Sequence, residues 1–202
     1  MKRWQRSEKR QIDIVNTAVG LFVQFSVRKT SMDDIAKAAK ASKVTIYKYF
    51  TDKETLCRKV FEHISNRYLQ SLNSPCDADA SLPDRMIQTT LQAAGFISSG
   101  QRALCEELAG VSSSIAQGYS MLLQRQTQLI FQLIREGRQQ SFIQSGPDDD
   151  IIFHYIDMGL CYYQTNSDYR HKIEYDARFR ERFMAFVWRN VFEGGTPFNR
   201  WQ

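Results

Sequence analysis

The chain has 202 residues, of which 43% are hydrophobic and 24% are charged, a composition typical of a folded protein with an apolar core. No apolar run approaches the roughly 20 residues that a membrane-spanning helix needs, which excludes a membrane partner for this sequence. Residues 1–60 contain 14 Lys and Arg against 6 Asp and Glu, whereas residues 61–202 contain 13 against 16. This asymmetry favours a head that binds a polyanion, although a solvated charged surface would have the same composition.

The thiols and the imidazoles give no sign of a metal or a cofactor. The four cysteines are Cys57, Cys76, Cys105 and Cys161. They form no CxxC pair, so we expect reduced thiols and a cytoplasmic protein. His154 and Asp157 share a helix flank with Cys161, but no second cluster of ligands accompanies them, and we expect no metal site. The N-terminal ten residues lead into an amphipathic stretch, so we expect no secretory leader.

The first 72 residues read as four helices. In the first, apolar residues recur at three- and four-residue steps and form one buried stripe: Ile12, Val15, Ala18, Val19 and Phe22. Thr30 or Ser31 is suited to cap a second helix, and Ser42 a third helix at 43–49. Thr51 or Asp52 is suited to cap a fourth helix that runs to about residue 72. The second and third helices are short, which is typical of a helix-turn-helix.

Prolines and small residues at 73–83 mark the boundary of a second region. Beyond this loop the apolar periodicity predicts five helices, at about 84–98, 101–109, 115–139, 148–166 and 173–193. No segment alternates long enough to predict a sheet. We therefore expect an all-α protein of about nine helices, with a helix-turn-helix head at 1–55, a connecting helix at about 53–72, and a helical bundle at 73–202.

The third helix has the side chains that a DNA-reading helix needs. Ile46 is expected to face inward, which leaves Lys43, Thr45 and Lys48 outward for base edges or phosphates. Tyr47 and Tyr49 offer phenolic donors to phosphate. The full set of expected DNA contacts is Thr30, Ser31, Ser42, Lys43, Val44, Thr45, Tyr47, Lys48, Tyr49 and Lys53. A small structural core would explain Ile46 and Phe50, but not the lysines gathered around them.

These motifs resemble the DNA-binding domain of the TetR family of bacterial transcriptional regulators. The matching segments over residues 12–64 are AVGLF at 18–22, TSMDDIAKAA at 30–39, SKVTIYKYF at 42–50 and DKETL at 52–56. Ser26 and Lys40 stand where the family usually has glycine. A lysine in the turn at position 40 is expected either to adopt a left-handed conformation, which is costly for a residue with a side chain, or to be accommodated by a slightly reshaped turn.

The resemblance implies that the rest of the chain is a ligand-binding and dimerising bundle. The expected dimer interface is Ile152, Tyr155, Ile156, Gly159, Tyr163, Phe179, Phe183, Phe186 and Val187. The expected ligand pocket is Met86, Phe96, Leu104, Cys105, Leu123, Gln126, Thr127, Ile130, His154, Met158 and Tyr162. Ordinary core packing would explain any one of these residues.

The sequence predicts a TetR-like regulator, most simply a repressor that binds a palindromic operator as a homodimer and is released by a small apolar or amphipathic ligand. One alternative is a DNA-binding factor without an inducer, whose bundle serves only dimerisation or protein contact. An enzyme is not expected, because the chain has no paired catalytic carboxylates, no nucleophile with a histidine partner and no phosphate-binding glycine loop.

Overall fold

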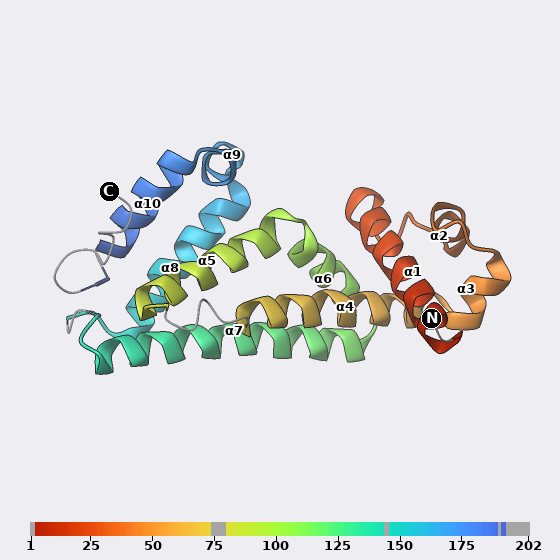
Figure 1. Ribbon diagram of the computed structural model, residues 1–202, viewed down its shortest axis with the longest axis horizontal. Coiled ribbons are helices and arrows are strands. Elements are labelled where there is room, and N and C mark those ends of the chain that lie inside the picture. Colours follow the sequence, from red (N-terminus) through yellow and green to blue (C-terminus); the bar gives the residue numbers. More distant parts are fainter. Residues whose placement is uncertain (1–2, 74–79, 144–145, 190, 193–202) are drawn as a thin grey trace. The chain divides into compact units, whose positions relative to one another are not determined.

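A computed structural model describes residues 3–73, 80–143, 146–189 and 191–192 (Figure 1). Within these ranges the chain forms ten α-helices and no β-strand, apart from one isolated bridge between Ile143 and Phe192. The helices are α1 Arg3–Phe25, α2 Met32–Ala38, α3 Lys43–Tyr49, α4 Lys53–Asn73, α5 Leu82–Ser98, α6 Gln101–Ala109, α7 Ser113–Gln139, α8 Asp149–Thr165, α9 Ser167–Tyr175 and α10 Ala177–Arg189. The predicted all-α class is confirmed. None of the described helices is long and apolar enough to cross a membrane.

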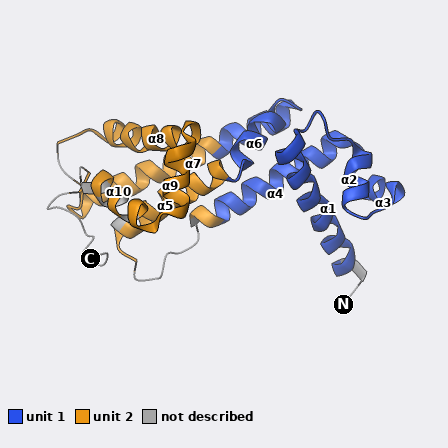
Figure 2. Cartoon of the chain, turned by 90° about the horizontal axis from the view of Figure 1, so that it is seen from above, with its two compact units in different colours: residues 1–70, 99–122 blue, residues 71–98, 123–202 orange. Residues whose placement is uncertain are grey.

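The helices divide into two compact units (Figure 2). Unit 1 contains residues 1–70 and 99–122, and unit 2 contains residues 71–98 and 123–202. Unit 1 thus holds α1–α3, most of α4, all of α6 and the start of α7. The sequence analysis divided the chain by function, into a DNA-binding head and a bundle that begins at residue 73. That functional division remains a proposal.

Polar side chains fix the helix starts in unit 1. Ser31 caps α2 in a capping box: its hydroxyl accepts from the amide of Asp34 at 3.1 Å, and the Asp34 carboxylate accepts from the amide of Ser31 at 2.8 Å. Ser42 caps α3 by accepting from the amide of Thr45 at 3.1 Å. Asp52 accepts from the amide of Thr55 at 2.7 Å at the start of α4. These caps set the short lengths of α2 and α3 and the direction of the turn between them.

Apolar side chains from four helices form the interior of unit 1. α1 packs on α2, α2 packs on α3, and α6 packs on α1. Ile14 and Phe22 of α1, Ile35 of α2, Ile46 of α3 and Leu56 of α4 are all fully buried. Because each helix buries a large aliphatic or aromatic side chain, removal of any one would leave a cavity in the core.

Unit 2 has a separate apolar core, in which α5 packs on α8, α8 on α9, and α9 on α10. Met86 of α5, Ile134 of α7 and Ile156 of α8 are among its buried side chains. The salt bridge between Arg138 of α7 and Asp149 of α8, at 2.5 Å, joins these helices at its edge.

The single helix predicted at 173–193 is wrong, because α9 and α10 replace it. The side chain of Asn166 accepts from the amide of Tyr169 at 2.8 Å and starts α9, which the sequence analysis did not predict. Asp176 accepts from the amide of Phe179 at 2.9 Å and starts α10. Both residues are common N-caps, so the break carries a sequence signal. The predicted end of this helix, at residue 193, lies outside the described residues.

Candidate functional site

The exposed surface of α3 carries most of the side chains that are predicted to contact DNA. Ile46 is fully buried and holds the helix to the core, while Lys43, Tyr47 and Lys48 are exposed. Val44 is 80% exposed, which leaves a branched apolar side chain in solvent with no interior contact to explain it. A methyl group beside cationic and phenolic donors suits the edges of base pairs, including the thymine methyl. Ser42 and Thr45 lie at the start of the helix, where their hydroxyls are 2.8 Å apart.

Four other predicted DNA contacts already have protein partners. Thr30 is only 3% exposed and its hydroxyl donates to the carbonyl of Ser26, so its side chain does not face solvent. The Nζ of Lys53 donates to the carbonyl of Val27 at 2.6 Å. The hydroxyl of Tyr49 accepts from Ser7 at 3.1 Å, and the hydroxyl of Ser31 donates to the Asp34 carboxylate at 2.6 Å. These side chains shape the head, and the exposed residues of α3 remain its available surface.

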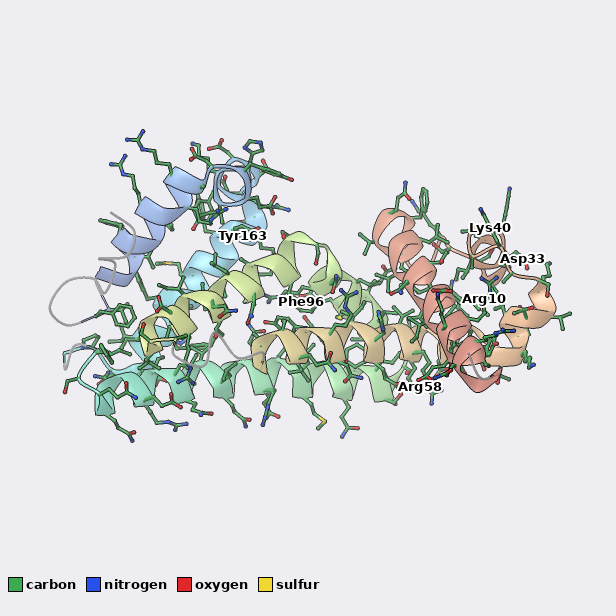
Figure 3. The ribbon with its side chains drawn as sticks, in the orientation of Figure 1. Arg10, Asp33, Lys40, Arg58, Phe96 and Tyr163 are labelled. Atoms are coloured by element: carbon green, nitrogen blue, oxygen red, sulfur yellow. The ribbon has the colours of Figure 1, made fainter. Side chains whose placement is uncertain are left out.

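The turn between α2 and α3 is left-handed at Lys40, with φ at 49°, as the sequence predicts. Arg10 of α1 holds this turn (Figure 3): its Nη2 donates to the carbonyl of Ala39 at 3.0 Å and to that of Lys40 at 2.6 Å. Ser26, the second position where glycine is usual, also has a positive φ, of 75°. Hydrogen bonds from the surrounding residues therefore hold two backbone conformations that are costly for residues with a side chain.

Asp33 of α2 forms an ion pair with Lys43 of α3 that was not predicted from the sequence. Its carboxylate lies 2.6 Å from the Nζ of Lys43, and both side chains are more than half exposed. Asp33 raises the pKa of Lys43 above its ordinary value, through this hydrogen bond and through its charge. A ten-residue separation between an acidic and a basic residue is common in any sequence, so the pair leaves no distinctive signal.

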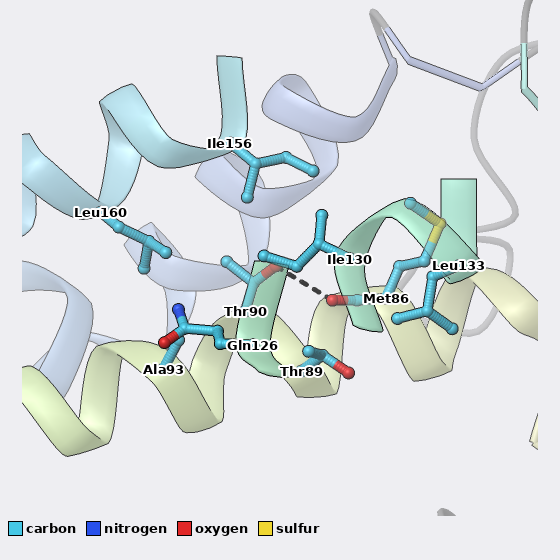
Figure 4. Close-up of a pocket in the computed structure, with 9 residues that line it drawn as sticks. All are labelled: Met86, Thr89, Thr90, Ala93, Gln126, Ile130, Leu133, Ile156 and Leu160. Carbon is cyan, nitrogen blue, oxygen red and sulfur yellow. Dashed lines mark hydrogen bonds between the residues drawn. The ribbon is translucent and has the colours of Figure 1, made fainter. Parts of the chain in front are cut away.

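Three of the eleven predicted pocket residues converge on one space, and that space is almost filled. Met86 of α5, Gln126 and Ile130 of α7, and Ile156 of α8 surround a space of about 10 Å³ (Figure 4). Thr90, on the same wall, donates its hydroxyl to the carbonyl of Met86 at 3.0 Å. A space of this size holds at most one water molecule.

The other predicted pocket residues are dispersed. Leu104 and Cys105 are buried in unit 1, and Phe96 is buried in α5. Leu123 and Thr127 are half-buried on α7, and His154 is exposed on α8. Met158 and Tyr162 line a different and larger cavity in unit 2.

The predicted dimer residues fall into two groups. Ile152, Ile156 and Tyr163 are buried in the core of unit 2 and have no surface to offer a partner. The others line the larger cavity or pack beside it, and are Tyr155, Gly159, Phe179, Phe183, Phe186 and Val187. Of the predicted dimer residues only Phe186 of α10 is exposed. Ile151, Met158 and Tyr162 of α8 are exposed as well but were not predicted for the interface, and we define these four residues as the apolar stripe. The α8 members are seven and four residues apart, so they share one helix face.

Two of the three described thiols are buried, and the described thiols are not part of a metal-binding group. Burial raises the pKa of Cys57 to about 11 and that of Cys105 to about 12. Cys161 is exposed, with its Sγ 3.9 Å from the Asp157 carboxylate. The described residues contain no group of three or more potential ligands that could hold a metal ion. Cys76 lies outside the described residues.

Comparisons with known proteins agree with this geometry. The family described as "Bacterial regulatory proteins, tetR family" matches residues 14–60, which span α1 from Ile14, all of α2 and α3, and the start of α4. No curated protein matches the chain. Several solved structures share its fold.

One of these structures is described as superantigen PfiT, which is 16% identical, covers 93% of this chain and 98% of its own, and has a TM-score of 0.74. The ketosteroid transcriptional regulator KstR2 of Mycobacterium tuberculosis is 14% identical over 91% of this chain and 95% of its own, with a TM-score of 0.69. A putative TetR-family regulator from Vibrio parahaemolyticus is 17% identical, covers 91% of this chain and 99% of its own, and has a TM-score of 0.66. Residues 14–60 therefore match the DNA-binding head of the TetR family, and most of the chain has the same fold as these solved structures.

Proposed function

We propose that the protein is a transcriptional repressor that binds a palindromic operator as a homodimer and is released by a small molecule. The observation that carries the proposal is the exposed surface of α3, where Val44 and Lys48 face solvent while Ile46 anchors the helix. A helix placed in this way enters the major groove through its outer residues. The basic composition of residues 1–60 supports attraction to DNA phosphates, and the site of action is the cytoplasm.

Self-association is proposed through the apolar stripe of α8 and α10. Phe186 is 65% exposed, Met158 63% and Tyr162 53%, so three large apolar side chains that line one cavity of unit 2 lie largely in solvent. Contiguous exposed apolar surface of this kind favours a protein partner. A second copy of the chain is the partner that twofold operator reading requires, because two half-sites one helical turn apart need two heads.

A gel-shift titration with the DNA upstream of the protein's own gene tests the reading surface. The test variant combines Lys43→Ala, Tyr47→Ala and Lys48→Ala. A matched control combines Arg125→Ala, Gln128→Ala and Arg135→Ala, which removes the same net charge from exposed positions of α7. We expect the first variant to lose specific binding and the control to retain it. If both variants bind the DNA equally well, the exposed residues of α3 do not determine operator binding.

A second candidate function is a DNA-binding factor without an inducer. The observation that favours it is the space of only about 10 Å³ among α5, α7 and α8, where the sequence analysis expected a ligand. Such a protein would bind its operator with the same affinity in the presence of any cell metabolite. A metabolite extract that lowers operator binding in the gel shift would argue against it.

A further inference from the structure

Unit 2 contains a second, larger cavity, which shares Thr90, Ile156 and Leu160 with the narrow space. Its volume is about 350 Å³, and its walls come from α5, α8, α9 and α10. Small-molecule sites in proteins have volumes of about 300 to 1,000 Å³. Unlike the narrow space among α5, α7 and α8, this cavity has room for a ligand.

Six of the 14 residues that line the cavity are aromatic. The aromatic residues are Tyr155, Tyr162, Tyr163, Tyr169, Phe183 and Phe186. Phe183 stacks on Phe179 at a centroid distance of 5.7 Å and meets the edge of Tyr169 at 5.2 Å, so this wall is held by ring contacts. Faces and edges of rings recognise another ring or an alicyclic frame by shape and dispersion.

Most polar groups of the wall already have protein partners. The hydroxyl of Tyr155 donates to the carbonyl of Val187 at 3.3 Å, and that of Tyr163 donates to Glu174 at 2.7 Å. The hydroxyl of Tyr162 accepts from Asn166 at 2.9 Å. The cavity therefore offers its occupant ring surfaces and methyl groups more than hydrogen bonds.

Charge is absent from the cavity wall as far as the described residues form it. An ionised carboxylate or ammonium group placed against this wall would lose part of its hydration without gaining a counter-charge, which is unfavourable. Burial also raises the pKa of Tyr169 to about 12, so its phenol is neutral in the cell. Both facts favour an uncharged occupant.

We propose that this cavity binds an uncharged, mainly apolar small molecule with a ring system, and that this molecule is the effector of the regulator. The inference rests on the proposed function and adds to it the place and the chemical class of the effector. Met158, Tyr162 and Phe186 belong both to the cavity wall and to the apolar stripe. An occupant is therefore in contact with the residues proposed for self-association, and it changes the packing of the dimer from that side.

Gly159 offers a way to fill the cavity without disturbing the fold. It lines the cavity, and a Cβ built on it meets no other atom within 4 Å. A leucine at this position would extend into the open space, and in a helix it is favoured over glycine. Gly95 of α5 is the matched control, because a Cβ there also meets nothing within 4 Å, the residue is exposed, and it is not part of the wall.

Two fluorescent probes with one scaffold test the site and its charge preference. N-phenylnaphthylamine is neutral, whereas anilinonaphthalene sulfonate is an anion of nearly the same shape. We expect the neutral probe to bind one per chain, and the anion to bind at least tenfold more weakly. Gly159→Leu should lower the affinity for the neutral probe at least tenfold, and Gly95→Leu should leave that affinity unchanged. Circular dichroism melting curves of both variants confirm that each is folded.

The outcomes that overturn the inference are specific. Binding retained by Gly159→Leu would place the probe elsewhere, and equal affinity for the anion would contradict the neutral class. Loss of the probe when protein concentration is raised into the dimeric range would mean that a second copy fills the cavity. Operator binding is measured on the same samples without probe. If the protein does not bind DNA but binds the probe as expected, the proposed function is wrong and the assignment of the cavity as a ligand site stands. If it binds DNA but not the probe, the proposed function stands and the cavity is not the ligand site.

Discussion

The carboxylate of Glu107, on α6, accepts a hydrogen bond from the backbone amide of Val27 at 2.9 Å. The same oxygen lies 3.4 Å from the amide of Arg28, and the carbonyl of Val27 accepts from Lys53 of α4 at 2.6 Å. Two helices therefore hold the loop between α1 and α2. This loop begins at the left-handed Ser26 and leads directly to the helix-turn-helix.

Substitution of Glu107 tests how much this contact contributes to unit 1. Glu107→Ala leaves two backbone amides without their acceptor, and we expect the free energy of unfolding to fall by about 1 to 2 kcal/mol. Glu107→Gln retains a side-chain oxygen acceptor, so its loss should be less than half as large. Urea unfolding followed by circular dichroism measures both. If alanine and glutamine cost the same, the hydrogen bond is not the source of the effect.

Lys40 is expected to be a stabilising site for glycine. Its φ of 49° is costly for a residue with a Cβ, by roughly 1 to 2 kcal/mol, whereas glycine adopts it freely. Lys40→Gly and Lys40→Ala remove the same charge but differ in this cost. After allowance for the greater freedom of glycine in the unfolded chain, we expect the glycine variant to be more stable by about 1 kcal/mol. Chemical denaturation of the pair provides the comparison, and an alanine variant of equal stability would argue against strain in the turn.

Asp33 is expected to weaken the attraction between Lys43 and DNA. Its carboxylate is 2.6 Å from the Lys43 ammonium and would also lie near the DNA phosphates. Asp33→Asn should therefore tighten operator binding and steepen the plot of log affinity against log salt by about 0.9, the slope of one more neutralised phosphate. Asp13→Asn changes the net charge equally at an exposed position of α1 and serves as control. If the two variants have equal slopes, the change in operator binding comes from the net charge of the protein and not from the ion pair between Asp33 and Lys43.

The described cysteines should differ sharply in reactivity. In a Cys76→Ser background, Ellman's reagent should titrate Cys161 in the folded protein, and Cys57 and Cys105 only after denaturation, since both are buried. The raised pKa values, about 11 and about 12, have a linked effect on stability. The unfolded chain loses these thiol protons first, so the free energy of unfolding is constant below the ordinary thiol pKa of about 8.5 and falls as pH rises above it.

Denaturant midpoints at about pH 7.5 and about pH 9.5 measure this linkage. The decrease should be smaller in a variant with Cys57→Ala and Cys105→Ala, which has no buried thiol of this kind. Rapid modification of all three thiols in the folded state would contradict the burial on which the prediction rests.

Local features of the fold were predictable because local chemistry sets them. Ser31, Ser42 and Asp52 are the residue types that cap helices, and the structure confirms each at one of the predicted positions. The left-handed turn at Lys40 was predicted from the resemblance, because the family usually has glycine at that position. The helix break at Asp176 has a similar local signal, because aspartate is a common N-cap. The apolar residues on both sides of it nevertheless fit one continuous helical period, and this longer pattern predicts a single helix.

Contacts between distant segments were not predictable in this way. Glu107 and Val27 are 80 residues apart, and nothing in either neighbourhood specifies the other. The same holds for the cavity, whose walls combine α5 with three later helices. The sequence identified the apolar residues of α8, but the assignment of Ile156 to the core and Met158 to a cavity depends on how neighbouring helices pack.

The composition of unit 1 has a consequence for building hybrid regulators. The chain passes between the units at residues 70/71, 98/99 and 122/123, so the DNA-reading head includes a segment that follows it by some thirty residues. A graft of residues 1–72 onto another family member would leave α6 behind and deprive the loop at Val27 of its Glu107 acceptor. A transplant that is meant to keep operator affinity must carry two pieces of this chain, the second of them α6 with the first turns of α7.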